Sequence, residues 1–161
     1  MRQKLILCIC STAAAVIAVA VIVVCTCFYP RLVIEDKNTG ERYATFRLPK
    51  NATFSIEFIH SVNKTPVRDF YEVRGSGDIY VVETHYYSFG AGVQTEINPG
   101  ETLEYGDDGS MQIKNINVLI PILIYAIGEN DDNLLVINDT TVKLRELCGY
   151  NSMIRFKIAR Y

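Results

Sequence analysis

The sequence contains no tryptophan, only two histidines and, after residue 30, only one cysteine, Cys148. One cysteine supplies neither a disulfide framework nor a zinc site, and we expect it to be buried and unreactive. With His60 and His85 as the only histidines, few residues are available as catalytic bases. The Gly-x-Ser-x-Gly motif of hydrolases and the Gly-Lys-Ser/Thr motif of phosphate-binding loops are both missing. These absences argue against nucleotide binding and give little support to catalysis.

A basic cluster is missing as well. The chain has sixteen Lys and Arg against eighteen Asp and Glu. Arg2 and Lys4 are the only charged residues before residue 31, so the remainder holds fourteen basic and eighteen acidic residues, a formal net charge of −4. Affinity for nucleic acid comes from phosphate neutralisation by many Lys and Arg side chains. The charge balance therefore argues against a nucleic-acid partner.

One long hydrophobic run is present, over residues 5–29, and it contains no charged side chain. Its length is sufficient to cross a hydrocarbon core of about 30 Å at about 1.5 Å per residue. Arg2 and Lys4 before it favour a cytoplasmic N-terminus. We expect residues 1–30 to be a signal anchor, a single transmembrane helix in the cell membrane, and residues 31–161 to be one extracytoplasmic domain. A cleaved signal peptide remains an alternative, as does a lipoprotein signal with Cys25 or Cys27 carrying the lipid.

After Pro30 the sequence changes to short alternating runs separated by turn residues, a pattern typical of strands. A Lys37-Asn38-Thr39-Gly40 turn and a Gly106-Asp107-Asp108-Gly109 turn predict hairpins. We expect an all-β fold, an antiparallel β-sandwich or barrel-like domain. The predicted strands are residues 32–35, 41–48, 53–60, 67–73, 79–87, 102–105, 111–117, 118–127, 134–137, 141–147 and 153–159.

Two of these segments leave alternatives open. Residues 118–127 predict a buried or edge strand with a kink at Pro121, although a short helix remains possible. Residues 141–148 have a spacing that a helix also uses.

Three segments alternate clearly enough to predict which side chains share a face. The shared faces are Phe54, Ile56, Phe58 and His60 in the first segment, Val67, Asp69, Tyr71 and Val73 in the second, and Val81, Glu83, His85 and Tyr87 in the third.

The histidines permit two chemical hypotheses. A small-ligand or metal-ion site would use His60, Glu83 and His85, because residues two apart on a strand share a face. A serine hydrolase would use Ser61 or Ser88, but neighbouring residues on a strand point to opposite faces, so His60 and Ser61 diverge. The plainer interpretation is that both histidines donate hydrogen bonds to backbone carbonyls at the edge of the core. Asp69 and Glu72 are likewise interpreted as a solvated strand edge.

The string Ser88-Phe89-Gly90-Ala91-Gly92 is the most unusual in the chain. Gly90 and Gly92 let backbone amides approach a partner closely, and Phe89 has the size to fill a pocket. The plainer interpretation is a tight connection that leaves the sheet.

Over residues 54–92 the sequence resembles the bacterial family DUF1850. The motifs that carry the resemblance are Phe54-Ser55-Ile56, Phe58-Ile59-His60-Ser61-Val62, Thr65-Pro66-Val67, Tyr71-Glu72-Val73 and the final Ser88–Gly92 string. Members are typically encoded beside TRAP-type transporters of the TAXI subclass. The resemblance implies an accessory role in solute uptake, and the hydrophobic run over residues 5–29 fits the short, membrane-tethered members of the family. With the residue arguments above, we expect a membrane-anchored, non-catalytic protein without a cofactor or metal. Its partner would be the TRAP-type permease or its solute-binding protein. The expected binding residues are His60, Ser61, Tyr71, His85, Ser88, Phe89, Gly90 and Gly92.

Overall fold

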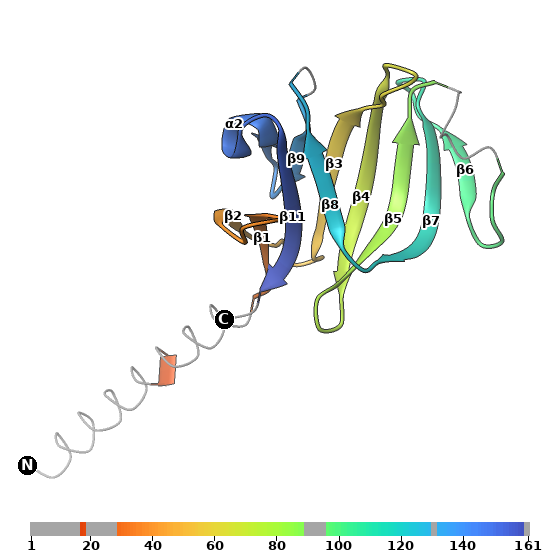
Figure 1. Cartoon of the computed structure of the whole chain (residues 1–161). Helices are drawn as coiled ribbons and strands as arrows, with labels where there is room; N and C mark the ends of the chain where they lie inside the picture. Colours follow the sequence, from red (N-terminus) through yellow and green to blue (C-terminus); the bar gives the residue numbers. More distant parts are fainter. Residues whose placement is uncertain (1–16, 19–28, 89–95, 130–131, 160–161) are drawn as a thin grey trace, which may run out of the picture.

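The structure, a computed structural model, describes residues 17–18, 29–88, 96–129 and 132–159. These residues form two antiparallel sheets that pack face to face as a β-sandwich (Figure 1). One sheet has four strands in the order β2-β1-β11-β8, and the other has seven in the order β10-β9-β3-β4-β5-β7-β6. The all-β prediction is confirmed, and the architecture is that of a sandwich.

The strands of the four-stranded sheet are β1 (Arg31–Asp36), β2 (Arg42–Arg47), β8 (Leu123–Ile127) and β11 (Ser152–Ala159). Those of the seven-stranded sheet are β3 (Thr53–Ile59), β4 (Pro66–Arg74), β5 (Asp78–Tyr86), β6 (Thr102–Tyr105), β7 (Met111–Ile120), β9 (Leu134–Ile137) and β10 (Thr140–Lys143). Both predicted hairpin turns occur, between β1 and β2 and between β6 and β7.

The segment predicted at 141–147 changes from strand to helix part of the way along. β10 ends at Lys143, and a short helix, α2 (Leu144–Cys148), follows. Leu144 is fully buried, and Leu147, three residues later, packs against the same core. The helical spacing of the two leucines, visible in the sequence, therefore decides the structure from residue 144 onward.

The core lies between the two sheets. Ile34 and Ile154 from the four-stranded sheet, and Ile56 and Leu135 from the seven-stranded sheet, have no exposed surface. Burying one such side chain stabilises the fold by about 1.5–3 kcal/mol. Ile56 lies between the polar residues Ser55 and Glu57, so alternation in β3 indicates which face is buried, whereas β9 is apolar throughout and gives no such indication.

Pro121 divides the segment that was predicted as one strand at residues 118–127, and the first three residues of that segment continue β7. β7 ends at Ile120 in the seven-stranded sheet, and β8 begins at Leu123 in the four-stranded sheet. Proline has no N–H to donate to a ladder, so pairing is interrupted at Pro121. The chain uses this interruption to cross from one sheet to the other, and the prediction of a single kinked strand is wrong.

The sandwich has two distinct ends. We call the one where the chain enters β1 the entry end: Arg31 there pairs with Arg47 and Ala159. The turn between β4 and β5 lies at the same end. Its Gly77 packs against Ile158 of β11, so closely that a Cβ added to Gly77 would lie 3.2 Å from the Cβ of Ile158. The opposite end, at the top of Figure 1, holds the connections β3–β4, the end of β5 and the β6–β7 turn, and we call it the far end.

The predicted transmembrane segment, residues 1–30, lies outside the described residues except for 17–18 and 29–30. Among the residues that the structure does describe, no helix has the length and apolar character needed to cross a bilayer.

Candidate functional site

His60 directly follows the last residue of β3, and its side chain is hydrogen-bonded within the β3–β4 turn at the far end. Its Nδ1 accepts hydrogen bonds from the backbone N–H groups of Val62 and Asn63, each at 3.3 Å. Its own backbone N–H donates to the Thr65 carbonyl at 2.9 Å. An accepting Nδ1 places the ring proton of neutral His60 on Nε2. The expected donation to backbone carbonyls is thus wrong, because the His60 ring accepts from the backbone.

The serines of the motif lie on either side of this turn. Ser61 is exposed on the turn itself, whereas the Ser88 hydroxyl lies 3.1 Å from the Thr65 hydroxyl. Two parts of the motif that are separated by more than twenty residues in sequence are therefore in contact at the far end. Within the described part of the chain, neither serine hydroxyl is hydrogen-bonded to a histidine ring, as a hydrolase pair requires.

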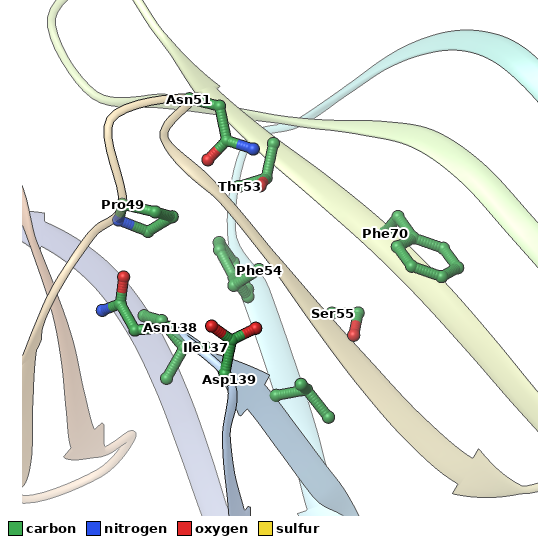
Figure 2. Close-up of a pocket in the computed structure, with 10 residues that line it drawn as sticks. Pro49, Asn51, Thr53, Phe54, Ser55, Phe70, Ile137, Asn138 and Asp139 are labelled. Carbon is green, nitrogen blue, oxygen red and sulfur yellow. The ribbon is translucent and has the colours of Figure 1, made fainter.

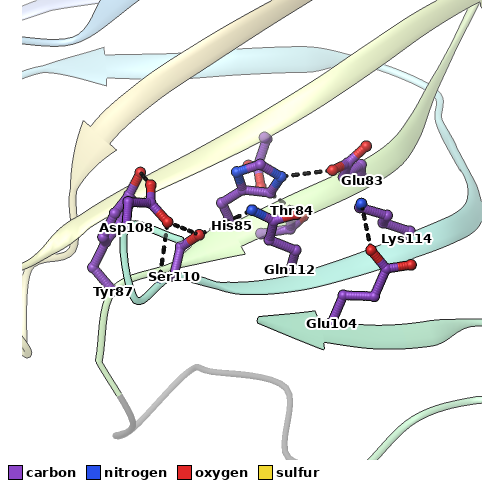
Figure 3. Close-up of polar contacts among 10 residues, drawn as sticks. Glu83, Thr84, His85, Tyr87, Glu104, Asp108, Ser110, Gln112 and Lys114 are labelled. Atoms are coloured by element: carbon purple, nitrogen blue, oxygen red, sulfur yellow. Dashed lines mark hydrogen bonds and ion pairs between the residues drawn. The ribbon is translucent and has the colours of Figure 1, made fainter. Parts of the chain in front are cut away.

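His85 lies on the outer face of the seven-stranded sheet (Figure 3). Its Nε2 is 2.6 Å from Oε1 of Glu83, and its ring packs against Phe70 with 4.7 Å between ring centroids. The prediction that Glu83 and His85 share a face is confirmed. The pair presents a polar group beside an aromatic ring, an arrangement suited to binding a planar or hydrogen-bonding group.

A β-bulge in β5 divides the face that was predicted for residues 81–87. Tyr71 pairs with Val81 but its neighbour Phe70 pairs with Glu83, so Val82 is the extra residue. Val81 packs against the core, whereas Glu83 points outward. The prediction that Val81 shares a face with Glu83 and His85 is therefore wrong. One inserted residue moves every side chain after it to the opposite face of the sheet.

Tyr71 does not lie on a surface with His85. It is 2 % exposed and faces the core, on the opposite side of the sheet from Phe70 and His85. The Tyr71 hydroxyl is 2.8 Å from that of Tyr125 in the opposing sheet. Tyr71 thus joins the two sheets and is not part of a binding face.

Asp69 belongs to the same buried group. Its carboxylate accepts hydrogen bonds from the hydroxyls of Thr84 at 2.9 Å, Tyr71 at 3.3 Å and Tyr125 at 3.4 Å. Burial raises the pKa of Asp69, and these hydrogen bonds oppose the rise. Burial also raises the pKa of both tyrosines, so their hydroxyls stay protonated and donate. The interpretation of Asp69 as solvated is wrong, whereas Glu72 faces outward and pairs with Arg74.

Phe89, Gly90 and Gly92 lie outside the described residues, so the motif is placed only as far as Ser88. Within the described ranges, no three His, Cys, Asp or Glu side chains are grouped as a metal ion requires. His60, Glu83 and His85 therefore do not form one group, and each histidine has separate partners.

Sequence reasoning missed a carboxylate at the far end. Asp108, in the β6–β7 turn, accepts from the Ser110 hydroxyl and N–H and, at 2.9 Å, from the Tyr87 hydroxyl (Figure 3). The hydrogen bonds from Ser110, followed by that from Tyr87, lower the pKa of Asp108 to about 2. Asp108 is thus a fixed negative charge beside the end of β5. The turn was visible in the sequence, but its contact with Tyr87 depends on strand pairing.

Phe70 also lines a hollow of about 310 Å³ together with residues of β3 and β9 (Figure 2). His85 lies on β5, on the other side of β4 from β3. The polar residues around the hollow are Asn51, Thr53, Ser55, Asn138 and Asp139. Phe70 therefore lies between a polar hollow and the Glu83–His85 pair.

Comparison with known proteins gives one match: the family model "Domain of unknown function (DUF1850)" matches residues 54–144, more than half of the chain. A search of curated proteins and a search of solved structures both return no significant match. The matched region begins in β3 and ends at the start of α2, so it includes all strands of the seven-stranded sheet. The chain belongs to the DUF1850 family.

Proposed function

We propose that the chain is a membrane-anchored, extracytoplasmic and non-catalytic accessory protein that binds a TRAP-type permease of the TAXI subclass or its solute-binding protein. The observation that supports this most directly is the contact between Thr65 and Ser88 at the far end. It brings the His60 turn to the start of the Ser88–Gly92 string, so family-motif residues from separate connections form one surface.

The position of this surface suits binding to another protein. It lies at the far end, opposite the entry of the chain into β1, and so faces away from an N-terminal anchor (Figure 1). Val62 is 65 % exposed there, and Asp108 adds a fixed charge. A protein interface combines apolar side chains with a polar rim, and the far end offers groups of both kinds.

Co-purification tests the proposal. Full-length chain is captured from membranes that contain the permease and the solute-binding protein, and co-eluting protein is quantified. Val62→Asp should reduce the captured partner by about tenfold, because one charged group in an interface centre removes more than 1 kcal/mol. Leu103→Asp, on edge strand β6 and 41 % exposed, is the matched control and should leave capture unchanged. Wild-type chain that captures neither protein would refute the proposal.

A second candidate function, small-ligand binding, is favoured by the position of Phe70 between the hollow and the Glu83–His85 pair. A ligand that binds only the native state raises the unfolding midpoint. Phe70→Ala should abolish any such rise, and His85→Gln should reduce it. If neither divalent cations nor polar organic solutes raise the midpoint of the wild-type chain, this alternative fails.

A further inference from the structure

The crossover between the two sheets carries exposed apolar side chains. Val118, Leu119 and Ile122 are 51 %, 45 % and 62 % exposed, and Pro121 between them is also exposed. No charged residue occurs between Lys114 and Glu129 in the sequence. Scattered exposed apolar residues are ordinary, but a run of them around one turn indicates a surface that contacts something other than water.

This turn is at the entry end of the sandwich. Ile122 directly precedes Leu123, which pairs with Phe156 of β11, and Phe156 pairs in turn with Ile34 of β1. β8 therefore runs in the same direction as β1 and begins level with Ile34, three residues beyond Arg31. On the other side of the crossover, Ile120 pairs with Ile79, which follows the β4–β5 turn at the entry end. In Figure 1 the β7–β8 crossover and the start of β1 both lie in the lower part of the domain.

The chain that enters there is the long apolar run, and it joins β1 almost without a linker. Only Pro30 separates Tyr29, the last residue of the run, from the first strand. The Pro30 carbonyl accepts from the Leu48 N–H at 3.1 Å, and the Arg47 guanidinium lies 3.9 Å from the Tyr29 ring centroid. Two extended residues span at most about 7 Å, so an anchor ending at Tyr29 keeps the entry end close to the bilayer.

We propose that the crossover of residues 118–122 inserts its apolar side chains into the interfacial region of the bilayer. This inference rests on the membrane anchoring in the proposed function. The contact does not require anionic lipid, because the turn is uncharged and gains from removing apolar surface from water. Tyr29 and Arg47 fit the same location, because tyrosine rings and long cationic side chains are favoured at the membrane–water interface.

The absence of tryptophan from the chain makes a direct test possible. Full-length chain carrying Ile122→Trp is reconstituted into phosphatidylcholine vesicles with or without brominated acyl chains, which quench nearby indole. Val62→Trp, at a far-end site with 65 % exposure against 62 % for Ile122, is the matched control. We expect brominated lipid to remove most of the fluorescence of the Ile122→Trp chain and none of that of the Val62→Trp chain. Leu119→Trp should respond like Ile122→Trp.

Each other outcome would overturn the inference. Blue-shifted but unquenched emission from the Ile122→Trp chain means that protein covers the turn, either residues 1–28 or a second copy. Emission of the Ile122→Trp chain at the wavelength of a water-exposed indole means that neither lipid nor protein covers the turn. Equal quenching of both chains means that the domain has no preferred end toward the lipid. Flotation of the vesicles separates this from the proposed function: chain that does not float refutes the anchor itself, whereas chain that floats without quenching refutes only the inserted turn.

Discussion

The hydroxyl of Thr84 donates to the Asp69 carboxylate at 2.9 Å, and this bond joins neighbouring strands β5 and β4 inside the core. Asp69 and Thr84 are direct cross-strand partners, in a row that continues from Ile56 to Ile113. One carboxylate thus lies within an otherwise uncharged row, where ionisation is opposed by burial and supported by three hydroxyl donors.

Asp69→Asn should remove one component of the pH dependence of the free energy of unfolding. Because burial raises the folded-state pKa of Asp69 above its unfolded value of about 3.9, the native state keeps this proton longer. Its stabilising contribution is complete below the unfolded pKa and is lost as pH rises through the folded pKa. Unfolding of the full chain in detergent, measured from pH 4 to 8, should show the variant gaining on wild type as pH rises. Parallel curves would contradict this.

Glu35→Gln should destabilise the four-stranded sheet. Glu35 is 8 % exposed and pairs with Arg155 and, at 2.7 Å, with Lys157. Removing its charge leaves two cations without a carboxylate, and we expect the free energy of unfolding to fall by about 1.5–3 kcal/mol. Glu104→Gln, which breaks the exposed Lys114–Glu104 pair, is the control and should change it by about 0.2–1 kcal/mol. Equal effects in denaturant unfolding would refute the distinction.

Core and crossover isoleucines should respond differently to truncation. Ile56 is fully buried between the sheets, so Ile56→Ala should lower the free energy of unfolding by about 2–5 kcal/mol. Ile122 is 62 % exposed, so Ile122→Ala should stay within about 0.5 kcal/mol in detergent-free buffer or mild detergent. A large loss for Ile122→Ala would show that the crossover is packed by protein.

Cys148 should react slowly with alkylating reagents. Burial raises the pKa of its thiol to about 11, whereas an ordinary thiol has a pKa of about 8.5. At pH 8 the thiolate fraction is on the order of a hundredfold lower than that of an exposed cysteine. Peptide mass spectrometry after iodoacetamide treatment measures the rate, with urea-unfolded chain as the reference. The Cys148 side chain is partly rather than fully buried, so the expectation of a buried cysteine is met only in part. Labelling of native and unfolded chain at the same rate would contradict this partial burial.

Most strand positions could be predicted because most strands have one face in the core. β6 is exposed throughout and was located by the Gly106-Asp107-Asp108-Gly109 turn that follows it. Ile34, Ile56 and Ile154 are buried where alternation requires it, and turn residues bound the segments. Strand partners could not be predicted, because a period of two does not specify which sheet a strand joins. The crossover at Pro121 is the clearest case: the sequence shows an interruption, and only packing shows a change of sheet.

Contacts between site residues of the same strand could be predicted from the sequence, whereas contacts between residues of different strands could not. Glu83 and His85 meet because both belong to one strand, two residues apart. Tyr71 was grouped with His85 wrongly, because the bulge at Val82 and the register between β4 and β5 decide which faces coincide. The contact of Thr65 with Ser88 likewise follows from pairing, which local sequence does not encode.

His60 offers a way to separate turn structure from partner binding. His60→Ala removes the acceptor of the Val62 and Asn63 N–H groups and should destabilise the chain by about 0.5–1.5 kcal/mol. His60→Asn keeps a short side-chain acceptor for the same N–H groups and should recover most of this stability. If His60→Asn restores both the free energy of unfolding and the capture of the permease, His60 acts only by stabilising the turn. If His60→Asn is stable and still captures less partner, the imidazole Nε2–H contacts the partner directly.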